Sequence, residues 1–292
     1  MAFKTFLQHQ HRPVLVRPRP RARLHQPTRR AVLAGAASVA AAGLGPEAAE
    51  AQPAAPVLTI AAASDLRYAL DELLQILQAQ QPGLAVEAVY GSSGKLSTQL
   101  LNGAPFGLFF SADRGYAQVL FDAGLCTQAP VVYARGHLVA ASRDAALARL
   151  PLREIVHNAA VKHFAIANPQ HAPYGQRARE ALQQQGLWDR VVPRLVLGDN
   201  VTQAAQFIDT GAAQAGLVAR SLVLAPSLRG RLAWQAIPSA WHSPLEQAWV
   251  LMKRTGSAAQ QRAAQLLALM QSPTGQALMQ RYGFESPGAA QR

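Results

Sequence analysis

The sequence lacks most of the residue patterns that indicate an enzyme. Among 292 residues there is one cysteine, Cys126, which excludes an intrachain disulfide and any cysteine-based metal cluster. No His-Glu-x-x-His or Gly-x-Ser-x-Gly pattern occurs, so neither a zinc protease nor a serine hydrolase is indicated. The stretch Gly91-Ser92-Ser93-Gly94-Lys95 is not a P-loop, because only two residues separate its glycines and a leucine follows the lysine. We therefore expect a protein that is not an enzyme, with no cofactor and no directly ligated metal.

Charged residues are also scarce. They make up 15% of the chain, against 50% hydrophobic residues, which is typical of a globular protein with well-filled cores. The formal net charge of +12 is concentrated at the start, where residues 1–50 hold eight Lys or Arg and two Glu. The net charge of residues 51–292 is only +6, so the sequence does not indicate binding to nucleic acid. After residue 51 no apolar run reaches the roughly 18 to 20 residues needed to span a bilayer.

Residues 1–51 have the organisation of a removable export signal of the twin-arginine type. The pair Arg29-Arg30 directly precedes an apolar, alanine-rich run over 31–44, and Ala49-Glu50-Ala51 has the form of a signal-peptidase site. The alternative is an arginine pair that occurs by chance in a disordered tail. The order of pair, apolar run and cleavage site favours export, with a soluble protein that begins near Gln52.

From residue 57 onward, short apolar runs alternate with segments of helical period, a pattern typical of α/β lobes with mainly parallel sheets. A helix is expected over 66–80, with its leucines on one face and a stop before Pro82-Gly83. The predicted strands cover residues 57–62, 85–89, 107–111, 138–141, 163–167, 194–197, 215–218 and 249–252.

Four predicted strands are followed by a tight polar turn and a helix start. These turns contain Ser64, Ser92-Ser93-Gly94, Ala172-Pro173-Tyr174-Gly175 and Asp199-Asn200-Val201. A helix start exposes unpaired N–H groups at the positive end of the helix dipole, so it can hold an anion without a charged side chain. A tetrahedral dianion has only acceptors, which suits such donors. For Ser64 or Ser93 taken singly, an N-cap that serves stability alone is favoured over a binding role, and the four turns together favour a binding site.

The sequence resembles the periplasmic molybdate-binding proteins of ABC importers over residues 57–285. The matching stretches are Ala61-Ala62-Ala63-Ser64, Gly91-Ser92-Ser93, residues 103–113, residues 167–175, Gly198-Asp199-Asn200-Val201 and Arg281-Tyr282-Gly283-Phe284. The resemblance implies an α/β, type II periplasmic-binding-protein fold, in which two lobes joined by hinge crossovers enclose a ligand cleft. The first lobe would comprise 57–133 and 245–285, the second 134–244, with a tail over 286–292.

The resemblance also implies the ligand-binding residues. Ser64 and Ser93 would donate from hydroxyl and backbone groups of the first lobe, and Tyr174 and Val201 from backbone N–H groups of the second. Ser92 and Asn200 are further possible contacts. Asp65 and Asp199 lie beside these residues, and we expect both carboxylates to point away because they would repel a dianion.

One departure from the family pattern affects the ligand shell. Many relatives carry a tyrosine, whose hydroxyl reaches the oxyanion, where this sequence has Ala219. Arg220, the next residue, either approaches the anion instead or is simply solvated.

By resemblance, the protein would be a periplasmic monomer that captures molybdate, and also tungstate, and delivers it to the permease subunits of an ABC importer. Two alternatives remain open. The same fold could bind another oxyanion such as sulfate or thiosulfate, or it could serve in an exported sensory or scaffold protein.

Overall fold

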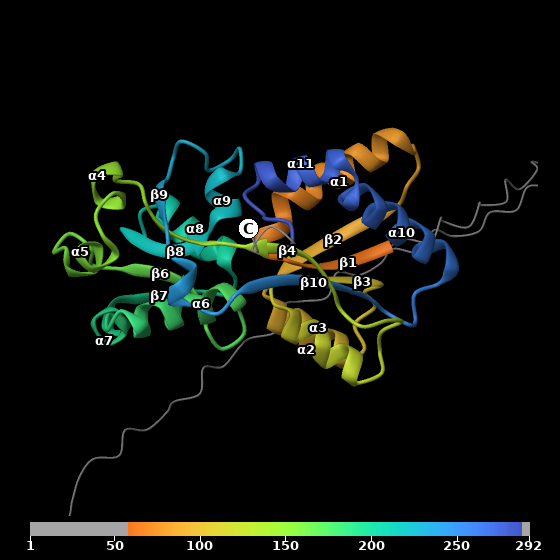
Figure 1. Ribbon diagram of the computed structural model, residues 1–292, viewed down its shortest axis with the longest axis horizontal. Helices are drawn as coiled ribbons and strands as arrows, with labels where there is room; N and C mark the ends of the chain where they lie inside the picture. The colour runs from red at the N-terminus through yellow and green to blue at the C-terminus, as the bar shows by residue number, and fades with distance from the viewer. Residues whose placement is uncertain (1–57, 288–292) are drawn as a thin grey trace, which may run out of the picture. The chain divides into compact units, whose positions relative to one another are not determined.

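Each half of the computed structural model is built around its own β-sheet (Figure 1). The structure describes residues 58–287. The predicted export signal over 1–51 and the tail residues 288–292 lie outside the described residues. Within 58–287, no helix has both the length and the apolar character required for a membrane span.

The first sheet has the strand order β2-β1-β3-β10-β4. Strands β1, β2 and β3 are parallel, whereas β10 runs antiparallel to both of its neighbours. We call this sheet and the helices packed on it the first lobe. Its elements are β1 (Leu58–Ala63), η1 (Ser64–Leu66), α1 (Arg67–Gln80), β2 (Val86–Gly91), α2 (Ser93–Leu101), β3 (Leu108–Ser111), α3 (Arg114–Asp122), β4 (Val131–Gly136), β10 (Leu245–Leu251), α10 (Ser257–Gln271) and α11 (Pro273–Arg281).

The second sheet repeats this arrangement, with the order β7-β6-β8-β5-β9 and with β5 antiparallel to β8 and β9. With its helices it forms the second lobe. Its elements are β5 (Leu138–Ser142), α4 (Ala145–Ala148), α5 (Leu152–His157), β6 (Phe164–Ala167), α6 (Pro173–Gln184), α7 (Trp188–Val191), η2 (Val192–Arg194), β7 (Leu195–Gly198), α8 (Val201–Asp209), β8 (Ala215–Ala219), α9 (Arg220–Leu224), β9 (Ala233–Ala236) and η3 (Ser239–Trp241).

Hydrophobic burial explains the position of the central strands. Every residue of β3, β5, β6 and β8 is buried, as expected for strands that are covered on both faces. Helix α1 packs against the first sheet with Leu70, Leu73, Leu74 and Leu77, which confirms the predicted apolar face. The Leu, Ile and Phe side chains of β1 and β3 contribute to the two hydrophobic cores of the first lobe, one of which also contains the α1 leucines.

The two lobes are joined near β4 and β10. The chain leaves the first sheet after Gly136 and enters β5 one residue later, so the lobe boundary predicted between 133 and 134 falls inside β4. The expectation of mainly parallel sheets also needs correction, because two of the four strand pairs in each sheet are antiparallel. The antiparallel strands are those that adjoin the crossovers.

Candidate functional site

The four predicted turns meet at one small cavity between the lobes. Ser64, Ser93, Tyr174 and Val201 all line it. It contains about 180 Å³ of empty space, of which about 10 Å³ admits the centre of a water molecule. That is about the room that one water molecule needs, so this conformation has no space for a sugar or a peptide. The other lining residues are Ala63, Asp65, Gly91, Ser92, Ala112, Ala172 and Pro173.

Helix starts supply the polar character of this cavity. Ser93 is the first residue of α2, Tyr174 the second of α6 and Val201 the first of α8. Neither α2 nor α6 has a side-chain hydrogen bond at its N-cap, so these two starts are not closed by a cap. Their N–H groups therefore remain suited to a ligand that only accepts hydrogen bonds.

The two serine hydroxyls are oriented as donors by their neighbours. Ser93 is fully buried, and its Oγ accepts a hydrogen bond from the backbone N–H of Ala112 at 3.0 Å. The Oγ of Ser64 accepts from the N–H of Thr202 in the second lobe at 3.4 Å. Because a hydroxyl has one hydrogen to donate, an Oγ that already accepts keeps that hydrogen for another partner. Neither serine caps its own helix, which favours the ligand-binding interpretation over capping.

Other polar contacts between the lobes surround the cavity. Ser92 Oγ lies 2.9 Å from His171 Nδ1, and Gly94 N–H donates to the His171 carbonyl at 2.9 Å. The Lys95 ammonium lies 2.9 Å from the Asp199 carboxylate, although both side chains are largely exposed and the pair contributes little energy. Asp199 is therefore paired with Lys95 and does not line the cavity, as expected.

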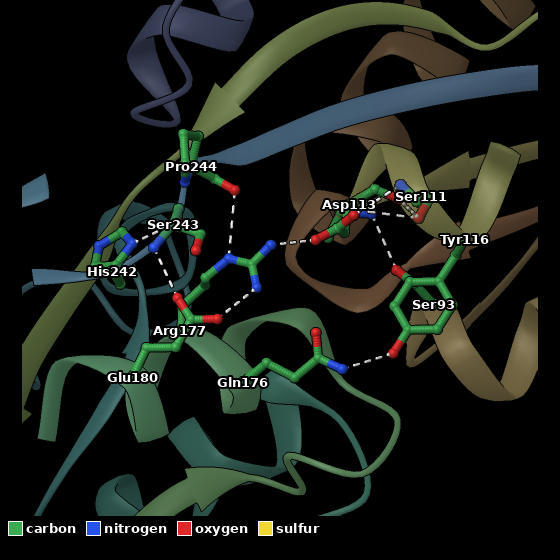
Figure 2. Close-up of polar contacts among 12 residues, drawn as sticks. Ser93, Ser111, Asp113, Tyr116, Gln176, Arg177, Glu180, His242, Ser243 and Pro244 are labelled. Carbon is green, nitrogen blue, oxygen red and sulfur yellow. Dashed lines mark hydrogen bonds and ion pairs between the residues drawn. The ribbon is translucent and has the colours of Figure 1, made fainter. Parts of the chain in front are cut away.

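A second interlobe contact is centred on Arg177 of α6 (Figure 2). Its guanidinium pairs with the carboxylate of Asp113, the N-cap residue of α3 in the first lobe, and also donates to Glu180 at 3.0 Å and to the Pro244 carbonyl at 3.3 Å. Since its side chain is only 11% exposed, this ion pair is more protected from water than the one at Lys95.

Asp65 is the one acidic residue on the cavity wall. Burial raises the pKa of its carboxyl to about 6, against the lowering effect of hydrogen bonds from Gln247, Tyr174 and nearby backbone N–H groups. One carboxylate oxygen, Oδ2, accepts from Gln247, whereas Oδ1 is buried without a hydrogen-bond partner among the described residues. The raised pKa favours the neutral form, which would repel an anion less than the carboxylate does.

Three further candidates do not line the cavity. Asn200 caps α8 by accepting from the N–H of Gln203, and Ala219 is buried at the end of β8. Arg220 donates from Nε to the Gly283 carbonyl at 2.9 Å and approaches the Glu285 carboxylate at 3.5 Å. It neither reaches the cavity nor is simply solvated, so it does not replace the tyrosine hydroxyl of the relatives.

Sequence reasoning missed two residues near the cavity. Thr202 donates from Oγ1 to the Ser64 carbonyl at 3.0 Å, and Gln247 of β10 donates to the Asp65 carboxylate. The signal for Gln247 was a polar side chain directly before the apolar run over 248–252. Within 58–287, no group of three or more His, Cys, Asp or Glu side chains is placed to hold a metal ion.

Comparison with known proteins adds the family. The molybdate-binding protein ModA of Rhodobacter capsulatus is 33% identical over 206 residues, which cover 70% of this chain and 79% of that protein. ModA of Azotobacter vinelandii is 32% identical over 205 residues, covering 69% and 79%.

Solved structures agree with this fold. The periplasmic molybdate-binding protein of Azotobacter vinelandii superposes with a TM-score of 0.72 and 30% identity, covering 79% of this chain and 99% of that one. The sulfate-binding protein SubI of Mycobacterium tuberculosis, with a TM-score of 0.65 and 12% identity over 80% of this chain and 88% of that one, shares the fold alone. The predicted two-lobed periplasmic-binding-protein fold is thus confirmed. Residues 58–285 match the family described as bacterial extracellular solute-binding protein, and the chain belongs to that family.

Proposed function

We propose that this protein captures molybdate, and the nearly isosteric tungstate, and delivers it to the permease of an ABC importer. The observation that carries the proposal is the cavity itself, where two helix starts without side-chain caps and two donor hydroxyls face one small space. The relatives that are about a third identical are molybdate-binding proteins, which supports this choice among oxyanions.

The site supports capture rather than chemistry. Its donors come from both lobes, so an anion held by Ser64 and Ser93 on one side and by the N–H groups of Tyr174 and Val201 on the other would favour the closed arrangement. Since an ion such as molybdate can only accept hydrogen bonds, each donor adds to affinity and none remains unsatisfied. We propose that the protein acts in the periplasm, a location that the extracellular character of its family supports. We also propose that it acts as a monomer.

A thermal-shift panel with molybdate, tungstate, sulfate and phosphate tests the ligand. At a hundredfold excess over its dissociation constant, a ligand that binds only the folded state stabilises it by about 2.7 kcal/mol. For a protein of this size the unfolding midpoint should rise by about 5 to 10 °C with molybdate or tungstate. A shift with sulfate or phosphate and none with molybdate would refute the assignment, and calorimetry would give the affinities directly.

Ser64→Ala tests the donor role of this hydroxyl. Among the described residues, the only hydrogen bond of its Oγ is the one across the cleft to Thr202, so the unliganded protein should keep its unfolding midpoint. Loss of a hydrogen bond to an anion should weaken molybdate binding by about ten- to a hundredfold in calorimetry. Ser93→Ala is the comparison variant, because it also leaves the buried N–H of Ala112 without its partner and should destabilise the unliganded protein. Unaltered affinity in Ser64→Ala would remove Ser64 from the site.

A further inference from the structure

A cluster of four polar side chains, three of them buried and one partly buried, lies behind the cavity. We call Asp65, Tyr133, Tyr174 and Gln247 the Asp65 cluster. Gln247 has no exposed surface, and Asp65 and Tyr174 are each 2% exposed. The Gln247 amide donates to the Asp65 carboxylate, its Oε1 accepts from the Tyr133 hydroxyl at 2.8 Å, and its Nε2 lies 3.4 Å from the Tyr174 hydroxyl. The Tyr174 hydroxyl also lies close enough to the Asp65 carboxyl to affect its pKa, and among the described residues the Oδ1 atom of that carboxyl has no hydrogen-bond partner.

These side chains come from both lobes and from the strands that adjoin the crossovers between them. Asp65 is in η1 of the first lobe, and Tyr174 is in α6 of the second. Tyr133 and Gln247 lie on β4 and β10, the two strands that adjoin the crossovers between the lobes. The pairing of β4 with β10 shifts register between Gln247 and Ala248, so Gln247 occupies an irregular position of the ladder.

Tyr174 is the one member of the cluster that belongs to the second lobe, and the first lobe fits closely around its hydroxyl. A Cβ built on Gly136, the last residue of β4, would lie 2.2 Å from the Tyr174 hydroxyl oxygen and 2.8 Å from Gln247 Nε2. Glycine at this position therefore leaves the space that the hydroxyl occupies. Tyr174 lines the cavity, and its hydroxyl ends in the Asp65 cluster, so one residue joins the two places.

We propose that the Asp65 cluster positions Tyr174 for ligand capture: its hydroxyl docks onto Asp65 and Gln247 when the lobes close, and this docking holds the Tyr174 N–H against the bound oxyanion. The inference rests on the proposed function. Tyr174 is then a ligand through its backbone and a positioning residue through its side chain. Because docking follows the encounter with the anion, it acts mainly on the dissociation rate.

Tyr174→Phe is the direct test, since it keeps the ring and the backbone N–H and removes only the hydroxyl. Stopped-flow fluorescence with molybdate should show a dissociation rate about ten- to a hundredfold faster, the effect of losing a hydrogen bond to a carboxylate, with the association rate within about threefold of the parent. The unfolding midpoint without ligand should stay unchanged, because the contact joins the lobes only when they are closed.

Tyr282→Phe is the matched control. Its hydroxyl donates to Glu72 at 2.9 Å, a tyrosine–carboxylate bond within the first lobe, so this variant should leave the dissociation rate unchanged. In a double-mutant cycle, Tyr174→Phe should add little to Asp65→Asn if both act through the same bond.

Two results would overturn the inference. One is an unchanged dissociation rate in Tyr174→Phe. The other is a fall in the unfolding free energy of unliganded Tyr174→Phe as large as the loss in binding free energy, which would show that the hydroxyl has a purely structural role. A parent protein that does not respond to molybdate at all would instead contradict the proposed function.

Discussion

Gly94→Ala is expected to weaken molybdate binding by about ten- to a hundredfold without destabilising the unliganded protein. Gly94 is the second residue of α2, and its N–H donates across the cleft to the His171 carbonyl at 2.9 Å. A Cβ built on Gly94 would lie 2.6 Å from that carbonyl oxygen and 3.0 Å from the Cα of His171. Both atoms belong to the backbone of the second lobe, so the methyl group opposes closure.

The same substitution favours the helix in the open protein. Alanine in a helix is more stable than glycine by about 0.5 to 1 kcal/mol, so the unfolding midpoint without ligand should stay level or rise. Calorimetry with molybdate and a thermal melt without it measure the two effects separately. Gly256→Ala, where a Cβ would meet nothing within 4 Å, is the control and should bind as the parent does. Parental affinity in Gly94→Ala would show that the lobes need not approach this closely around the ligand.

Asp65 should make the stability of the closed conformation depend on pH. Its carboxyl has a pKa of about 6 in the folded protein and an ordinary value of 3.8, so the folded state binds the proton more tightly. The favourable contribution is complete below pH 4 and is lost as the pH rises through 6. Between full protonation and pH 7.5, this difference in pKa lowers the free energy of unfolding by about 3 kcal/mol. The neighbouring Tyr133 and Tyr174 stay neutral throughout, because burial and the Asp65 charge raise both of their pKa values well above 10.

Asp65→Asn isolates this effect. Denaturant unfolding of parent and variant at pH 4 and pH 7.5 gives four free energies, and the difference between the two pH changes removes the other carboxylates from the comparison. The parent should lose about 3 kcal/mol more than Asp65→Asn between these pH values. Any hydrogen bond that asparagine fails to make affects both pH values alike. Equal pH changes in the two proteins would mean that Asp65 keeps an ordinary pKa.

The sequence predicted the buried strands well, but only two of the four edge strands, β2 and β7. Continuous apolar runs such as 107–111 and 163–167 mark strands covered on both faces, and β3 and β6 lie there. The other two edge strands, β4 and β9, were missed, and both consist largely of partly buried or exposed residues. The first half of β10 was missed for another reason, since Glu246 and Gln247 interrupt its apolar character.

The cavity residues were predictable where the signal was local. A strand, a polar turn and a helix start are adjacent in the sequence, and this pattern together with the family resemblance located Ser64, Ser93, Tyr174 and Val201 at one cavity. The surroundings of Asp65 were not predictable, because its partner Gln247 lies 182 residues further along the chain. Arg220 was misplaced for the same reason, since the carbonyl that it binds belongs to Gly283.

The position of β10 has a consequence for synthesis of the chain. This strand lies between β3 and β4 in the first sheet, yet it comes from residues 245–251, after all five strands of the second sheet. The second sheet draws its strands from one continuous segment, 138–236, and has all of them before β10 has been made. The first sheet begins 80 residues earlier, at residue 58, but lacks β10 until residue 251 has left the ribosome. The lobe that starts the chain is therefore the lobe that is completed last, and β3 and β4 lack the strand between them while the other sheet is free to form.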